Sequence, residues 1–446
     1  MKTSIPPGRV RRNRLPGPES SGISTSLFAN GSVVVVLLLA LGIGGSAETA
    51  SPGDGCRVPF EGTEFIRSGA IVGTESGVLV SGMRVDALDP AGPLSLDEVA
   101  TPWLFHETDG GRDLPFRGER MDRVASLAPV AGQDGSYFLV WGETVPPDPA
   151  MGPLPRYMSQ ELWISRKAGD HWTEPKRILR AGNVHWEFGR TIRYTADGTP
   201  LAMVGTAERL LLVGIGPVHF GVLPDGLGVV PVPDGASPML GSFDLGPNGE
   251  VEAVLLGETD GDGPRRLLLI HMTSHDLGRT WSEPRTVASW PRTRAWPANL
   301  RVHLDGSGVL HALWNTNEEG SGQAPPIRHL FRAPGGEVWE EGGTGPTDGS
   351  ALRWVSGVDR RGTLTMMEEV LRPTARTLSG LQSRRWADPD GWSEPEFLTP
   401  GLQAGYLFDG EGADGTWRIG WIGTTGVDPS PSAAGPPTFR LCVEEP

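Results

Sequence analysis

Common catalytic and metal-binding motifs are missing from this 446-residue sequence. It has no H-E-x-x-H or C-x-x-C pair, which argues against the usual zinc sites, and it has no P-loop to cradle a nucleotide phosphate. No serine stands in a G-x-S-x-G turn, and the nine histidines are scattered singly. We therefore expect neither a metal ion nor a cofactor.

Positive charge and long apolar runs are also scarce. Lys and Arg number 39 against 54 Asp and Glu, and the net charge of −15 argues against nucleic acid as a partner. The apolar run 33–43 would span about 17 Å as a helix, whereas a bilayer core is about 30 Å thick. Four arginines precede this run and Gly45-Ser46-Ala47 follows it, so residues 1–47 resemble a cleaved signal peptide. We expect a secreted or periplasmic protein without a membrane span after processing; an uncleaved N-terminal anchor helix is the alternative.

Cysteine is rare, and its two copies stand near the two ends of the proposed mature chain. Cys56 follows the expected cleavage site closely, and Cys442 lies just before the C-terminus. A secreted chain meets an oxidising compartment, where an even pair of cysteines favours a disulfide. We predict a bond between Cys56 and Cys442, with two free thiols as the alternative.

The sequence is also too rich in glycine and proline for a mainly helical protein. Gly and Pro number 63 and 41, and both residues break helix interiors, whereas 15 Trp need a core to pack in. An apolar run, a glycine turn and a second apolar run recur seven times at intervals of about 56 residues, which fits four short strands with their connections. The turn glycines are Gly77, Gly135, Gly198, Gly249, Gly308, Gly362 and Gly415. We predict one all-β domain over 48–446, a β-propeller of four-stranded blades, with seven blades favoured over six.

A second element recurs between these turns. It is complete at Ser274–Trp281 (SHDLGRTW), weaker at Ser165–Trp172 (SRKAGDHW), and weaker again at Asp388–Trp392 (DPDGW). The Asp side chain can accept backbone N–H groups across a tight turn, glycine supplies the left-handed residue, and the tryptophan covers the hairpin. We therefore expect these residues to be structural.

The complete element is similar to the Asp-box, S-x-D-x-G-x-T-W, of sialidases and related BNR-repeat proteins. The matching residues are Ser274, Asp276, Gly278, Thr280 and Trp281. The resemblance implies a β-propeller with the boxes at outer hairpins, on the side away from the active site. Sialidases of this family have six blades, whereas the sequence has seven repeat units.

The resemblance also implies a site in which three arginines clamp a carboxylate, a Glu-activated Tyr is the nucleophile and an Asp is the acid or base. Candidate substrate-binding residues are Arg67, Arg84, Arg301 and Arg353, and candidate catalytic residues are Tyr406 and Asp89. No glutamate matches the position that would activate the tyrosine. We therefore expect a monomeric propeller that binds a carbohydrate or protein ligand at its channel face, and the sequence leaves open whether it is also an enzyme. The alternative is an exo-glycosidase of the sialidase class that cleaves terminal acidic sugars.

Overall fold

The computed structural model describes the chain from residue 56 to residue 444 with gaps. The described residues are 56–60, 65–74, 77–85, 101–106, 113–132, 135–144, 159–185, 192–206, 210–215, 228–259, 263–292, 296–317, 327–344, 351–371, 379–387, 391–398, 403–412, 414–425 and 438–444. The proposed signal peptide and Asp89 lie outside them. No helix in the described part of the chain is long and apolar enough to cross a membrane. Its single helix is the short 3₁₀ helix η1 (Gly118–Arg123).

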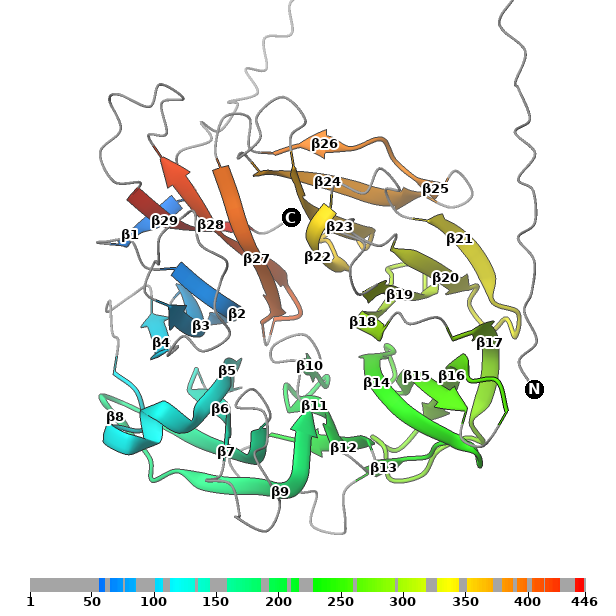
Figure 1. Cartoon of the computed structure of the whole chain (residues 1–446), viewed down its shortest axis with the longest axis horizontal. Coiled ribbons are helices and arrows are strands. Elements are labelled where there is room, and N and C mark those ends of the chain that lie inside the picture. The colour runs from blue at the N-terminus through cyan, green and yellow to red at the C-terminus, as the bar shows by residue number, and fades with distance from the viewer. Residues whose placement is uncertain are drawn as a thin grey trace, which may run out of the picture. The chain divides into compact units, whose positions relative to one another are not determined.

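The described strands form six antiparallel sheets arranged as a ring (Figure 1). The first sheet contains β2 (Phe65–Thr74), β3 (Gly77–Val85) and β4 (Thr101–His106). The second contains β5 (Val124–Ala131), β6 (Tyr137–Glu143), β7 (Ser159–Ala168), β8 (His171–Trp172), β9 (Lys176–His185), β10 (Ile192–Tyr194), β11 (Pro200–Thr206), β12 (Leu210–Gly214) and β13 (Gly228–Val230).

Four further sheets complete the ring, and for each of them the strand nearest the centre of the ring is named first (Figure 1). The third contains β14 (Ala236–Leu245), β15 (Val251–Thr259), β16 (Arg266–Ser274) and β17 (Arg285–Pro291). The fourth contains β18 (Trp296–Leu304), β19 (Leu310–Asn317), β20 (Arg328–Arg332) and β21 (Glu340–Thr344). The fifth contains β22 (Ala351–Val358), β23 (Leu364–Leu371), β24 (Ser379–Ala387), β25 (Gly391–Trp392) and β26 (Glu396–Phe397). The sixth contains β27 (Gln403–Glu411), β28 (Trp417–Thr425), β29 (Thr438–Glu444) and β1 (Cys56–Phe60).

The all-β propeller prediction is confirmed, but the number of blades differs from our expectation. The second and third repeat units are continuous, because β9 pairs with β7 on one side and with β11 on the other, at Gly205↔His185 and Thr206↔Val184. The two halves of this sheet also pack on each other through buried residues such as Val140 and Leu211. Seven repeat units therefore occupy six sheets of the described chain, and the expectation of seven separate blades is wrong.

The hairpin turns between the first and second strands of the repeats follow one pattern. In the turn after β18, the Asp305 N–H donates to the Val309 carbonyl over 3.0 Å and the Gly308 N–H donates to the Asp305 carbonyl over 2.9 Å. Six of the seven predicted turn glycines adopt φ between 71° and 81°, which favours glycine; Gly77 instead opens β3. The repeat identified in the sequence is therefore a repeated hairpin, as predicted.

The complete Asp-box forms the turn between β16 and β17, the two outer strands of the third sheet. The Thr280 N–H and hydroxyl donate to the two Asp276 carboxylate oxygens over 2.8 and 2.7 Å, and the Gly278 N–H donates to Ser274 Oγ over 2.8 Å. These hydrogen bonds, the Thr280 backbone donor first, lower the pKa of Asp276 to about 2. Trp281 packs against the core between the second and third sheets. The box thus stabilises its own turn.

The ring closes through the two ends of the described chain. β1 is the fourth strand of the last sheet and pairs with β29, in a register that sets Cys56 opposite Cys442. The side chains of both cysteines lie outside the described part, so their disulfide stays a prediction. Beside this sheet, Gly410 of β27 lies so close to the Ile71 carbonyl of β2 that a Cβ atom would collide with it.

Candidate functional site

A polar cavity of about 240 Å³ lies at one end of the central channel. We call it the channel pocket. It is lined by the C-terminal ends of the inner strands β10, β14, β18, β22 and β27, where each strand enters its hairpin turn. Its polar side chains are Arg193, Asp244, Arg301, His303, Ser356, Asp359, Asp409, Glu411 and Trp417. Because antiparallel strands alternate in direction, these turns share a sheet edge with the Asp-box turns. The channel pocket therefore lies on the Asp-box side of the ring.

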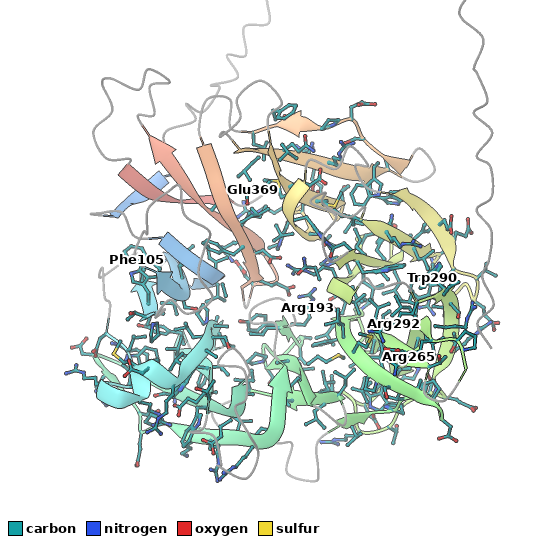
Figure 2. The ribbon with its side chains drawn as sticks, in the orientation of Figure 1. Phe105, Arg193, Arg265, Trp290, Arg292 and Glu369 are labelled. Atoms are coloured by element: carbon teal, nitrogen blue, oxygen red, sulfur yellow. The ribbon has the colours of Figure 1, made fainter. Side chains whose placement is uncertain are left out.

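Arg193 of β10 is the cation at the centre of the ring (Figure 2). Its Nε donates to Asp244 Oδ1 over 3.0 Å, Nη1 to the Ile192 carbonyl over 3.0 Å, and Nη2 to the Val302 carbonyl over 3.2 Å. Burial alone would lower the pKa of Arg193, but the carboxylates of Asp244 and Glu411 raise it above its usual value. Arg193 is therefore a fixed cation whose three nitrogens already have acceptors in the protein.

His303 of β18 is buried beside Arg193 and is neutral. Burial, and next the positive charges of Arg193 and Arg301, hold the pKa of His303 well below its usual range. Arg193 Nη2 lies 3.4 Å from His303 Nδ1, and His303 Nε2 lies 2.9 Å from Ser356 Oγ. Since an arginine can only donate, Nδ1 is the acceptor and the Nε2–H donates to Ser356. This leaves the Ser356 hydroxyl hydrogen to donate elsewhere.

Arg301 and Asp409 form a buried bidentate ion pair that links β18 to β27. Arg301 Nη1 donates to Asp409 Oδ2 over 3.0 Å and Nη2 to Oδ1 over 2.9 Å, and Trp417 Nε1 donates to Oδ2 over 3.1 Å. The two side chains are 2% and 3% exposed, so solvent hardly screens the pair. Both carboxylate oxygens of Asp409 are occupied by partners within the protein.

Glu411, at the end of β27, differs from the other acids of the channel pocket. Its Oε2 lies 3.5 Å from Arg193 Nε, but that N–H donates to Asp244, and the Glu411 carboxyl forms no hydrogen bond with a described residue. Burial raises the pKa of Glu411 to about 8: Arg193 opposes this shift, and the charges of Asp244 and Asp414 add to it. The side chain is 22% exposed, into the pocket that it lines. Glu411 is thus an accessible carboxyl group that keeps its proton at neutral pH.

The channel pocket has no net positive charge. Two arginines face Asp244, Asp359 and Asp409 there, and Glu411 adds a further negative charge when it ionises. Asp359 Oδ1 accepts the N–H groups of Arg361 and Thr363 and so also holds the turn after β22. Both arginines are paired with carboxylates, so this end of the channel disfavours an anion. No group of His, Cys, Asp or Glu side chains in the described ranges has the arrangement of a metal site.

Of the predicted site residues, Arg301 lines the channel pocket, where its guanidinium faces Asp409. Arg67 on β2, Arg353 on β22 and Tyr406 on β27 lie in the first halves of their strands, towards the opposite end of the channel. All three strands are bulged there. Arg84 lies near the end of β3. The side chains of these four residues, and the whole of Asp89, lie outside the described part, so the arginine clamp and the tyrosine nucleophile stay predictions.

The sequence interpretation missed most of the channel pocket, although a signal was available. Arg193, Asp244 and His303 each stand five residues before the turn glycine of their own repeat. The next two repeats have Gly357 and Gly410 at this position. An alignment of the repeats on their turn glycines would have shown a polar residue at this position in three successive repeats and a glycine in the next two. All five positions lie on inner strands.

The sequence matches no known family model and no curated protein. Among solved structures, the chain is similar to a polysaccharide lyase of family PL25, an ulvan lyase, with 10% identity over 87% of this chain and 96% of that chain and a TM-score of 0.54. A protein of unknown function from Dyadobacter fermentans DSM 18053 has 12% identity over 88% and 98%, with a TM-score of 0.46. A leech intramolecular trans-sialidase has 13% identity over 86% and 68%, with a TM-score of 0.38. The similarity to the ulvan lyase, at 10% identity, shows a shared fold.

Proposed function

We propose that the protein is a glycan-binding β-propeller whose channel pocket holds a neutral saccharide unit. The observation that carries this proposal is the pairing of Arg193 and Arg301 with Asp244 and Asp409. This pairing removes the anion-binding capacity of the site and leaves a polar cavity without net positive charge.

The remaining groups suit hydroxyl groups, which both donate and accept hydrogen bonds. Ser356 and Glu411 border the cavity as a hydroxyl and a protonated carboxyl. The cavity volume of about 240 Å³ is below the range of roughly 300–1,000 Å³ that is typical for drug-sized ligands. A single sugar ring is therefore the expected occupant. Secretion, expected from residues 1–47, would bring the protein into contact with extracellular glycans.

The test compares binding of neutral and acidic sugars. Methyl glucoside, galactoside, mannoside and rhamnoside, with N-acetylneuraminic and glucuronic acid as the acidic set, are titrated against the protein by saturation-transfer NMR and calorimetry. We expect binding in the neutral set and none in the acidic set. Binding restricted to the acidic set, or no binding at all, would contradict the proposal.

A blocking variant locates the site. Val358 lines the channel pocket and is half-buried, so Val358→Trp should fill the cavity and reduce affinity at least about tenfold, equivalent to about 1.4 kcal/mol. The matched control is Val229→Trp on the outer strand β13, where the valine is 45% exposed. Equal loss of binding in both variants would place the saccharide elsewhere.

Cleavage of sialosides at the opposite end of the channel is the second candidate. It is favoured by the bulges at Arg67 and Arg353, because bulges often redirect side chains next to active sites. Release of a fluorophore from a sialoside by the wild type, abolished in Tyr406→Phe, would support it. Lack of release by the wild type would exclude it.

A further inference from the structure

We propose that Glu411 donates a hydrogen bond from its carboxyl group to the bound saccharide, so that the channel pocket takes up ligand only while this group holds a proton. The inference rests on the proposed function and names the residue that controls it. It makes saccharide binding a proton-linked process.

The hydrogen bonds of the channel pocket single out Glu411. Asp244 Oδ1 accepts from Arg193 Nε, and its Oδ2 accepts the Leu304 N–H over 2.7 Å. Asp409 is equally occupied by Arg301 and Trp417. The Glu411 carboxyl lines the same cavity and forms no hydrogen bond with any residue in the described ranges. It is therefore free to meet a ligand that enters.

The surroundings of Glu411 explain why it would act as a donor. The nearest cation, Arg193, cannot offer its Nε–H, because that hydrogen already points to Asp244. An ionised Glu411 would add a further negative charge beside those of Asp244 and Asp414. Ionisation is unfavourable there, and a neutral carboxyl has one O–H to donate.

The charged and titratable groups around Glu411 come from several elements. They are Arg193 and Tyr194 on β10, Asp244 on β14, Arg301 and His303 on β18, Asp359 after β22, Asp409 on β27, Asp414 in the turn, and Arg418 on β28. Hydrogen bonds from Arg418 and Thr416 outweigh burial and lower the pKa of Asp414 to about 2, so Asp414 is ionised at neutral pH. His303 is neutral throughout, because its pKa is far below its usual range. Burial raises the pKa of the Tyr194 phenol well above its usual value. Glu411 is therefore the group expected to change charge near pH 8.

A distinct dependence on pH follows. Below pH 7 nearly all molecules hold the proton, so affinity is constant. Above pH 8, each further pH unit lowers the protonated fraction about tenfold, and the apparent Kd rises by about the same factor. Near pH 8, binding also draws one proton from the buffer in those molecules that had lost it.

The experiment measures this linkage with the neutral methyl glycoside that binds most tightly in the panel. Calorimetric titrations from pH 6 to pH 10, and at pH 9 in two buffers of different ionisation enthalpy, give the slope of affinity and the number of protons taken up. Wild type should show an affinity loss of about tenfold per unit above pH 8 and uptake of close to one proton at pH 9.

Two variants assign the proton. Glu411→Gln keeps a hydrogen-bond donor but cannot ionise, so the slope above pH 8 should disappear, whatever its affinity at pH 6. Glu396→Gln removes a 67% exposed carboxylate of β26 and should keep the wild-type slope.

The possible failures are distinguishable. A neutral saccharide that binds wild type with the same affinity from pH 6 to pH 10 overturns the role of Glu411 and leaves the glycan-binding function intact. A slope that survives in Glu411→Gln assigns the proton to another group. The absence of saccharide binding at every pH overturns the proposed function, and this inference with it.

Discussion

Two carboxyl groups of one propeller, Asp276 and Glu411, have pKa values shifted in opposite directions. Asp276 lies in an exposed turn, where Thr280 and Ser274 supply its hydrogen bonds and lower its pKa to about 2. Glu411 lies at the channel, where burial without a hydrogen bond raises its pKa to about 8. The difference shows that burial without a donor raises the pKa of one carboxyl group, whereas local hydrogen-bond donors lower the pKa of the other.

The two regions also differ in how they are assembled. Every partner of Asp276 in the box lies within four residues along the chain. The channel pocket joins five inner strands, and Arg301 meets Asp409 across 108 positions of sequence. The Asp-box turn can therefore form from its own residues alone, whereas the channel pocket forms only when the ring brings distant strands together.

Removal of Arg301 should have the largest effect. Arg301→Ala leaves Asp409 as a buried charge without its main partner, which should lower the free energy of unfolding by roughly 3–5 kcal/mol. Arg285→Ala breaks a surface pair with Glu337 and should cost about 0–1 kcal/mol. Urea unfolding of both variants measures this contrast. Equal stability of the two would show that the channel ion pair does not hold the ring together.

Removal of the box tryptophan comes next. Trp281 is half-buried and packs against the core, so Trp281→Ala should destabilise by roughly 2–4 kcal/mol. The folded fraction should keep its saccharide affinity, because Trp281 is not among the residues that line the channel pocket. Full stability combined with lost binding would reverse the roles that we assign to the two regions.

Glu411→Gln should stabilise the protein, and only at higher pH. The folded pKa of about 8 lies above the ordinary value of 4.5, so between these pH values the unfolded chain releases a proton that the folded protein keeps, and stability falls as pH rises. The variant lacks this fall and should be more stable than wild type at pH 9, with no difference at pH 4. Denaturant midpoints at both pH values check the sign. A variant less stable than wild type at pH 9 would show that the ionised carboxylate is favourable in the folded state.

Asp276→Asn should give the smallest effect, with the opposite dependence on pH. The folded pKa of about 2 lies below the ordinary value of 3.8, so Asp276 contributes stability above pH 4 that is lost as pH falls towards 2. The variant should therefore be less stable than wild type at pH 7, with the gap closing in acid. Thermal unfolding from pH 7 to pH 2 measures it. A gap that is constant with pH would mean that lost packing, not lost charge, causes the change.

The sequence was informative wherever partners are close in the chain. Turn glycines such as Gly308 and Gly362, and the Asp-box, were predicted because their hydrogen bonds span four residues or fewer. The fusion of the second and third repeats was not predictable, since it depends on two residue pairs between β9 and β11.

The chemistry of the candidate site was also hidden from the sequence. Arginines were expected to face a ligand, but Arg301 instead meets an aspartate contributed by the last repeat. The resemblance to sialidases directed attention to one end of the channel, whereas the described pocket lies at the other. The spacing of residues along one strand does not show which charged side chain of a distant repeat will lie beside them in the closed ring.

The pairing of β1 with β29 has a consequence for how the chain folds. The contact joins residues 56–60 to residues 438–444, so the sequence separation of the paired residues is the largest among the strand pairs of the described chain. Closing so long a loop is slow, and until it closes β29 presents an unpaired edge on which other chains can add. We expect ring closure to be a late step of folding, reached only after the last strand has been synthesised. A transporter or chaperone that keeps β1 and β29 apart would therefore prevent the last sheet from forming and the ring from closing.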